Sequence, residues 1–211
     1  VNNLIFLGSS CIYPKLSKQP IKEKYLLSGY LEKTNEPYAI SKIAGISLCE
    51  SYNRQYKLNY KCLMPCNAYG INDNYDPVGS HFFPALIKKI IDAIKYRKEE
   101  ISIWGNGKPL RELIYSEDVA EACIFFLKKK TPETLINIGT GKDKSITEYA
   151  NIIMKHLGVN FKINYKLEKP NGTMRKVLDV SLAKRYGWSY KTPLKKGLAI
   201  TINDYLKKNL S

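Results

Sequence analysis

Short apolar runs alternate with longer amphipathic segments along most of this chain. The apolar runs predict strands at 4–8, 60–65, 101–105, 135–141 and 161–166, because each run is short and is bounded by glycine, proline or polar residues. The amphipathic segments predict helices at 35–56, 81–96, 116–130 and 145–158, and the remainder after 166 is expected to be mostly helical. Strands that alternate with helices in this way predict an α/β protein with a largely parallel sheet.

The first predicted helix carries apolar or small residues at helical spacing. They are Ile40, Ile43, Ala44, Ser47 and Leu48. Residues at i, i+3, i+4, i+7 and i+8 share one face of a helix. This stripe is therefore expected to pack against the sheet.

Helix ends are marked by residues with known capping preferences. Pro37 suits the first turn of its helix, and Ser116 is expected to be an N-cap. Ser145 and Glu148 have the spacing of a capping box, and Gly158 is placed to stop the same helix.

Charge narrows the range of partners. The 211 residues carry a net charge of +15, but the lysines are spread over the whole length and rarely cluster. We therefore expect no nucleic-acid partner, whereas a small polyanionic ligand fits the charge. No apolar stretch approaches the length that spans a membrane, and no secretory signal is present, so no membrane association is expected.

The cysteines indicate a reducing environment. There are five of them, an odd number, and no CxxC pair occurs. This pattern predicts neither a disulfide framework nor a metal site, and a cytoplasmic location is expected.

Reactive side chains gather where the first strand ends. The stretch "GSSCIYP" at 8–14 follows an apolar strand directly, and ligands of parallel sheets bind at the carboxyl ends of strands. Tyr38 and Lys42 are four residues apart, so they share one face of the next helix. An ammonium near a phenol favours the phenolate, which suits the tyrosine to proton transfer. Ser9 can offer a second hydroxyl to the same substrate oxygen.

At these residues the sequence resembles the extended short-chain dehydrogenase/reductase family, and within it the GDP-L-fucose synthases. The resemblance rests on "FLGSSCIYPK", "TNEPYAISKIAGISLCESYNRQY", "NAYGINDNY", "WGNGKPLRELIYSEDVAEA", "INIGTG" and "KPNGTMRKVLDV". It covers nearly the whole chain. It implies NADPH-dependent epimerisation and reduction of GDP-4-keto-6-deoxy-D-mannose to GDP-L-fucose, usually by a homodimer.

The resemblance also implies the fold. We expect the C-terminal part of an NAD(P)-binding Rossmann-like doubly wound parallel sheet, with a smaller α/β substrate-binding domain. Residues 1–70 are assigned to the Rossmann part and 71–211 mainly to the substrate-binding part, with a segment at about 108–140 returning to the Rossmann sheet. For the homodimer, the far face of the 35–56 helix is a candidate contact surface, since it carries Cys49, Tyr52 and Tyr56.

One departure from the family pattern is large. The family opens with a glycine-rich GxxGxxG turn that cradles the cofactor pyrophosphate, and this sequence lacks it. The "GTG" at 139–141 comes late and lacks the third glycine. We therefore expect roughly 100 residues upstream, about three βα units at about 30 residues each. The residues that choose NADP over NAD are expected there too.

The resemblance assigns five catalytic residues: Ser9, Cys11, Tyr38, Lys42 and His81. Epimerisation beside a ketone needs a base on one face and an acid on the other, and Cys11 and His81 match the family's acid–base pair. Taken alone, Cys11 is better interpreted as a small buried hydrophobe, and its place beside Ser9 and Tyr38 reverses that preference. His156 is expected to be a surface residue at a helix end.

The resemblance also assigns binding residues. Those expected to contact NADP are Leu7, Gly8, Ser9, Ser10, Tyr38, Lys42, Pro65, Cys66, Asn67, Ala68 and His81. Those expected to bind the GDP-sugar are Lys89, Trp104, Arg111 and Asn171. An arginine suits a pyrophosphate because its planar fork donates in pairs. Lys89 stands where many relatives have arginine, Asn171 where aspartate is frequent, and Trp104 is equally compatible with a core aromatic.

Two other functions stay open. Another nucleotide-sugar epimerase or dehydratase is possible within the superfamily, although a dehydratase should carry threonine and glutamate near the position of Ser9. A catalytically incomplete nucleotide-sugar-binding fragment is the alternative from a different class.

Overall fold

The computed structural model describes residues 1–76 and 79–209. It contains two compact units, each built from several stretches of chain. Unit 1 comprises Val1–Ala68, Glu112–Lys142 and Lys176–Thr192, and unit 2 comprises Tyr69–Arg111, Asp143–Arg175 and Pro193–Ser211. Residues 176–192 thus cluster with unit 1. The assignment of the parts to a Rossmann domain and a substrate-binding domain stays a proposal.

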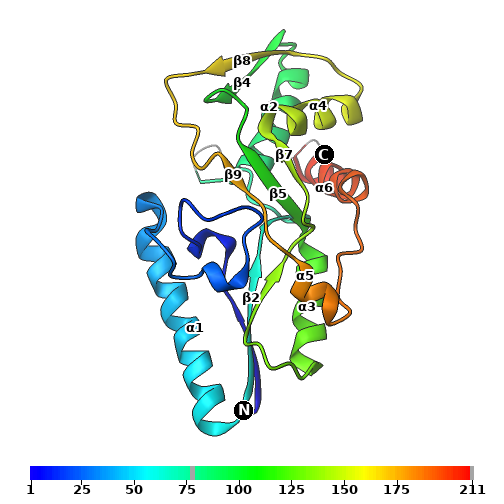
Figure 1. Ribbon diagram of the computed structural model, residues 1–211. Helices are drawn as coiled ribbons and strands as arrows, with labels where there is room; N and C mark the ends of the chain where they lie inside the picture. Colours follow the sequence, from blue (N-terminus) through cyan, green and yellow to red (C-terminus); the bar gives the residue numbers. More distant parts are fainter. Residues whose placement is uncertain (77–78, 210–211) are drawn as a thin grey trace. The chain divides into compact units, whose positions relative to one another are not determined.

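Unit 1 is built on a parallel sheet of three strands. These are β1 (Asn3–Leu7), β2 (Asn59–Pro65) and β6 (Leu135–Ile138), in the order β1-β2-β6. Leu7 pairs with Leu63, and Cys62 pairs with Leu135. The helices of this unit are α1 (Glu36–Tyr56), α3 (Ser116–Lys128) and α5 (Ser181–Arg185), with 3-10 turns at Ser10–Ile12, Glu23–Tyr25 and Lys33–Asn35 (Figure 1). The predicted α/β class with a parallel sheet is confirmed.

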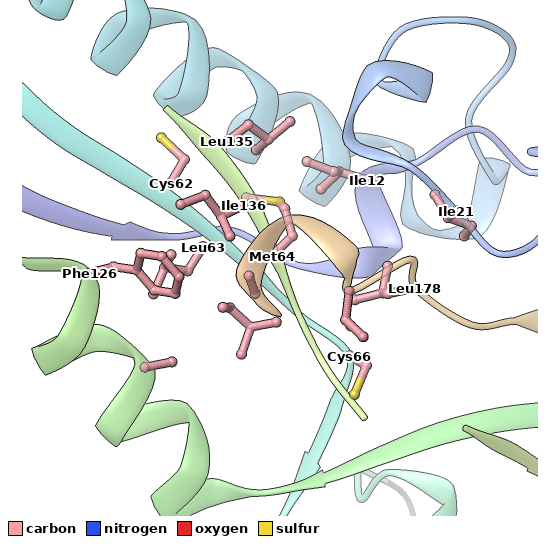
Figure 2. Close-up of a cluster of buried hydrophobic side chains, with 14 of the residues drawn as sticks. Ile12, Ile21, Cys62, Leu63, Met64, Cys66, Phe126, Leu135, Ile136 and Leu178 are labelled. Atoms are coloured by element: carbon pink, nitrogen blue, oxygen red, sulfur yellow. The ribbon is translucent and has the colours of Figure 1, made fainter. Parts of the chain in front are cut away.

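The core of unit 1 lies on this sheet. Figure 2 shows Leu63 and Met64 of β2 close to Ile136 of β6, and all three side chains are fully buried. Phe126 of α3 and Ile12 of the first 3-10 turn belong to the same buried cluster. Fully burying one such side chain stabilises the fold by about 1.5–3 kcal/mol. Because Ile12 is part of this core, the turn that carries Ser9 and Cys11 is fixed in place.

Helix α1 packs on β1 and β2 with a different face from the predicted one. The predicted stripe is wrong for most of its residues: Ile40 is 55% exposed and Leu48 is 61% exposed, whereas Ile43 packs against the core. The buried residues of this helix are Ala39, Ile46 and Cys49.

A close approach at Gly45 accompanies the observed face. A Cβ on Gly45 would lie 2.3 Å from Cζ of Phe6, so the absence of a side chain there lets the ring of Phe6 lie against the helix. A count of apolar positions does not register a glycine, so it overlooks this contact. Cys49 was expected on the far face and is buried instead, whereas Tyr52 and Tyr56 are exposed.

Unit 2 combines a pair of parallel strands with helices. The strands are β4 (Glu100–Trp104) and β8 (Lys162–Lys166), and Trp104 pairs with Lys166. The helices are α2 (Phe82–Lys95), α4 (Ile146–Leu157) and α6 (Leu194–Asn209). Helix α2 packs on α4 and β4, where Phe82 and Phe83 contact the ring of Tyr149.

The ends of α4 are as the sequence predicts. The capping box of Ser145 and Glu148 is present, and Gly158 ends the helix in the left-handed region at φ 69°. The start of α3 differs: Ser116 is its first residue and Tyr115 its N-cap, so the predicted serine cap is wrong. Pro37 lies in the first turn of α1, as expected.

The sequence pattern did not predict four short strands. They are β3 (Asn67–Tyr69), β5 (Leu110–Tyr115), β7 (Asp143–Ser145) and β9 (Arg175–Lys176). They lie where the chain passes from one unit to the other. Residues 167–180 contain β9 and turns, so the expectation that the chain after 166 is mostly helical is wrong for this segment. In the part of the chain that the structure describes, no helix is both long and apolar enough to cross a bilayer.

Candidate active site

The carboxyl ends of β1 and β2 form one edge of the unit 1 sheet. Because the strands are parallel and paired, the residues after Leu7 and those after Pro65 emerge side by side. The backbone N–H of Gly8 donates to Leu63 O at 2.9 Å, and that of Cys66 donates to Ile138 O at 2.9 Å. Both predicted cofactor-contacting segments therefore begin on this edge with fixed backbones.

Ser9 and Cys11 are held by the 3-10 turn that follows β1. Ser9 is the N-cap of the turn, and its Oγ accepts the backbone N–H of Cys11 at 3.1 Å. As an acceptor in this bond, the hydroxyl keeps its own proton free to donate. Ser10 is 2% exposed, whereas the side chain of Cys11 is only partly buried.

Tyr38 and Lys42 come from the first turns of α1, which packs against this 3-10 turn. The Lys42 ammonium donates to the carbonyl oxygen of Leu7 at 2.9 Å. It lies 5.8 Å from the centroid of the Tyr38 ring. Tyr38 is 46% exposed, so its hydroxyl is accessible. The predicted pair thus lies on one helix face beside the end of β1.

A fifth residue, which sequence reasoning missed, joins this group. The Lys176 ammonium lies 3.5 Å from Sγ of Cys11, as a hydrogen-bond donor. We call Ser9, Cys11, Tyr38, Lys42 and Lys176 the strand-end cluster. Lys176 lies within the quoted stretch "KPNGTMRKVLDV", but no spacing rule connects it to a cysteine 165 residues earlier.

The segment 65–68 offers mainly its backbone. The side chain of Cys66 is buried, which raises the pKa of its thiol well above its ordinary value. The Asn67 side chain donates from Nδ2 to Glu112 O at 3.0 Å, and Ala68 is exposed. A ligand at this edge would meet main-chain groups rather than the Cys66 thiol.

Glu112 is a buried carboxylate beneath the same edge. Its Oε1 accepts the backbone N–H groups of Thr140 and Gly141, each at 2.6 Å, and its Oε2 accepts that of Leu178 at 2.7 Å. Burial raises the pKa of Glu112, while these backbone bonds oppose the rise. The glycine-rich turn at 139–141 is therefore tied to Glu112 of its own chain.

Unit 2 contains a cavity of about 310 Å³. It brings together the four residues predicted to bind the GDP-sugar. It is lined by Ser80, Phe82, Ala85, Leu86, Lys89, Ser102, Ile103, Trp104, Pro109, Arg111, Ile146, Pro170 and Asn171. We call it the basic cavity.

Two cations of the basic cavity are held by carbonyl oxygens. Arg111 donates from Nη1 to Thr173 O at 2.6 Å and to Leu110 O at 2.9 Å. Lys89 donates to Ser102 O at 3.2 Å, and burial lowers the pKa of its ammonium.

The ring of Trp104 makes cation–π contacts with two lysines. The Lys89 ammonium lies 5.7 Å from the Trp104 ring centroid, and that of Lys169 lies 5.8 Å from it. Trp104 is 60% exposed, so it is not a core aromatic. This combination of cations and an open aromatic face suits an anion that carries a planar ring.

Asn171 has a structural bond as well as a place in the cavity wall. Its Oδ1 accepts the backbone N–H of Asn106 at 2.8 Å, which holds the turn at Gly105.

The two histidines occupy helix ends in unit 2. His81 is the exposed N-cap of α2, and its neighbours Ser80 and Phe82 both line the basic cavity. His156 is exposed in the last turn of α4, as expected. Among the described residues, no group of three or more His, Cys, Asp or Glu side chains is placed to hold a metal ion.

The NAD dependent epimerase/dehydratase family matches residues 1–139. The chain belongs to this family. The family resemblance predicted from the sequence motifs is confirmed.

The chain is 46% identical to the GDP-L-fucose synthase of Escherichia coli strain K12, over 98% of its own length and 67% of that protein. It is 44% identical to GDP-L-fucose synthase 1 of Arabidopsis thaliana, over 98% of its length and 64% of that protein. It is also similar to the solved structure of the GDP-mannoheptose C4 reductase of Campylobacter jejuni with NADP bound. That match has 32% identity and a TM-score of 0.84, and covers 97% of this chain and 70% of the other. The chain thus spans about two thirds of the length of these proteins.

Proposed function

We propose that this protein catalyses the NADPH-dependent epimerisation and reduction of GDP-4-keto-6-deoxy-D-mannose to GDP-L-fucose. The observation that carries the proposal is the strand-end cluster. The proposal is supported by a thiol on a turn that packs against the helix of a tyrosine–lysine pair, in a chain 46% identical to a GDP-L-fucose synthase. A reductase alone needs no thiol, whereas an epimerase needs an acid–base group besides the tyrosine.

The residues fit the nicotinamide half of the dinucleotide. The Lys42 ammonium uses one donor on Leu7 O, which leaves two N–H groups for the hydroxyls of a ribose. Backbone groups at 8–10 and 65–68 lie on the same edge. These segments would hold the cofactor, which supplies the hydride when bound.

In the reduction, Tyr38 donates its phenolic proton to the ketone oxygen. Lys42 stabilises the phenolate that remains, because its ammonium lies within 5.8 Å of the ring centroid. Ser9 Oγ accepts the backbone N–H of Cys11, so its own hydroxyl proton is free. We propose that this hydroxyl donates a second hydrogen bond to the ketone oxygen. Two donors oriented before reaction stabilise the developing oxyanion.

In the epimerisation, the Cys11 thiolate removes a proton from a carbon beside the ketone and becomes a thiol. The electrons of the C–H bond pass into the ketone, which becomes an enolate. We propose that His81 returns a proton to the same carbon from the opposite face, which restores the ketone with inverted configuration. Before the second flanking carbon reacts, Cys11 releases its proton to solvent and His81 takes one up from solvent. That carbon then follows the same two steps.

The basic cavity is the proposed site for the GDP moiety. Arg111 and Lys89 would bind the pyrophosphate, and Trp104 offers an exposed ring face to the nucleotide. Asn171 adds a donor at the cavity wall. Because residue 89 is a lysine, which lacks the planar fork of arginine, we expect a single ionic contact there rather than a bidentate one.

We further propose that the protein is a homodimer in the cytoplasm, in contact through the exposed face of α1. This face carries Ile40, Leu48, Tyr52 and Tyr56, all at least 47% exposed. All five cysteines are free, which fits a reducing compartment. Light scattering on wild type and on Leu48→Glu tests the dimer: the charge should yield monomers, and a wild type that is already monomeric would contradict it.

The test of function is an NADPH oxidation assay. The protein is expressed with whatever residues its gene encodes ahead of Val1 and is supplied with GDP-4-keto-6-deoxymannose. We expect oxidation of NADPH only with this substrate and GDP-L-fucose as the product. Activity with a UDP-sugar and none with the GDP-sugar would assign the protein to another nucleotide-sugar epimerase. Binding of the GDP-sugar without turnover would favour a binding protein.

A further inference from the structure

The contact between Lys176 and Cys11 joins two segments that are each fixed by the surrounding structure. At one end, the backbone of Cys11 is held by Ser9 Oγ, and Ile12 beside it is fully buried. At the other end, the residues after Lys176 are anchored. Val177 O accepts the N–H of Ile21 at 2.8 Å, and Leu178 N donates to buried Glu112 at 2.7 Å. The backbones that bring Nζ and Sγ to 3.5 Å are therefore both anchored, and both side chains are partly buried.

The positive charge of Lys176 is not paired with a carboxylate among the described residues. Within residues 1–76 and 79–209, it takes part in none of the ion pairs. Its neighbour Arg175 differs, because the Arg175 guanidinium pairs with Asp143 at 2.6 Å. The Lys176 side chain is also partly buried, so its interaction with the thiol is less screened than on an open surface.

Two other polar groups near Cys11 are bonded elsewhere. Helix α1, which packs on the turn, contributes Tyr38 and Lys42, and the Lys42 ammonium is bonded to Leu7 O. Tyr13, which follows the turn, donates its hydroxyl to Asn137 at 2.6 Å. Lys176 places its ammonium in direct contact with the sulfur.

We propose that Lys176 is a positioning residue that stabilises negative charge on the Cys11 sulfur and holds the sulfur at the strand-end edge. The inference rests on the proposed function in that it assigns Cys11 the role of base. The ammonium stays protonated throughout. It stabilises the negative sulfur before proton abstraction and donates its hydrogen bond to the neutral thiol afterwards. Nearby lysines are among the groups that make cysteines reactive at neutral pH.

The test is the alkylation rate of Cys11 by iodoacetamide as a function of pH, read on the Cys11 peptide by mass spectrometry. The protein is again expressed with whatever its gene encodes ahead of Val1. Lys176→Met should slow alkylation near neutral pH by about tenfold or more and move the profile to higher pH, because an opposite charge this close to a thiolate has an effect of that order. Lys176→Arg should restore most of the rate.

The controls separate charge from structure. Lys128→Met removes one positive charge at the exposed end of α3, and Cys11 should alkylate as in wild type. Circular dichroism and thermal unfolding establish that each variant is folded, and Lys176→Gln replaces the methionine variant if the latter does not fold. Equal rates in wild type and in folded Lys176→Met or Lys176→Gln would overturn the proposal. Equal loss in Lys176→Met and Lys176→Arg would overturn it as well, since the charge would then be irrelevant.

This measurement needs neither NADPH nor a sugar. A protein inactive on the GDP-sugar whose Cys11 responds to Lys176 would contradict the proposed function and leave this inference standing. An active protein whose Cys11 alkylation does not change on mutation of Lys176 would support the proposed function and contradict this inference.

Discussion

The strand-end cluster and the basic cavity hold their side chains in different ways. In the cluster, the short side chains of Ser9 and Cys11 lie on a turn that follows a strand and packs into the core, and Ser9 Oγ accepts the backbone N–H of Cys11. In the cavity, long side chains reach inward from α2, β4 and β5, and Trp104 is 60% exposed. Under the proposed function, the cluster carries out proton transfer and the cavity binds the charged sugar nucleotide. Changes in the first should affect the chemical steps, and changes in the second should affect binding.

The largest expected effect is that of Tyr38→Phe. The ring keeps its place on α1, but the ketone oxygen loses its proton donor, so reduction should slow by about 10²–10⁴-fold. Exchange of solvent deuterium into the sugar should continue. Tyr52→Phe, on the same helix, is the matched control and should leave both steps intact. Loss of exchange together with reduction would mean that the two steps share Tyr38.

Cys11→Ser should give the reverse pattern. A hydroxyl is a much weaker acid than a thiol, so the variant lacks a usable base at neutral pH. Deuterium incorporation at the epimerised carbons should fall by about 10²-fold or more, while an already epimerised ketone is still reduced. Cys123→Ser controls for the loss of a partly buried thiol elsewhere in unit 1. Unchanged exchange in Cys11→Ser would make the thiol a packing residue.

Arg111→Ala tests the basic cavity. Removing charged hydrogen bonds to a pyrophosphate should raise KM for the GDP-sugar by about 10- to 100-fold with little change in kcat. Arg111→Lys should recover part of this, because it keeps the charge but not the fork. Arg54→Ala, on the exposed surface of α1, should leave KM unchanged. A fall in kcat with KM unchanged would place Arg111 in the chemistry and break the comparison.

The smallest effect concerns stability beneath the strand-end edge. Glu112→Gln should lower the free energy of unfolding by about 1–3 kcal/mol, because an amide NH2 would face one of the three backbone N–H donors. Urea unfolding measures this, with exposed Glu50→Gln as the control.

The pH dependence of the same group has a definite sign. Burial raises the pKa of Glu112 above its ordinary 4.5, so the folded protein binds this proton more readily than the unfolded chain. The contribution of Glu112 to the free energy of unfolding is fully present below pH 4.5 and is lost as the pH rises through the raised pKa. Glu112→Gln should flatten this decline in urea unfolding at a series of pH values. A decline as steep as that of wild type would assign the pH dependence to other groups.

The sequence by itself determined the parts of this protein that depend on local order. Alternating apolar runs and helical patterns predicted the α/β class and the parallel strands. The capping box of Ser145 and Glu148 predicted a helix start, because it depends on residues three apart. Tyr38 and Lys42 could be paired from their spacing alone, since helix geometry places residues four apart on one face.

The tertiary structure decided what depends on residues far apart in the chain. The buried face of α1 is accompanied by the approach of Phe6 to Gly45, which no periodicity contains. The contact of Lys176 with Cys11 and the hold of Glu112 on Thr140, Gly141 and Leu178 join segments separated by 28 to 165 residues. Such contacts arise only when the packed core fixes both segments, because neither segment carries a local signal for the other.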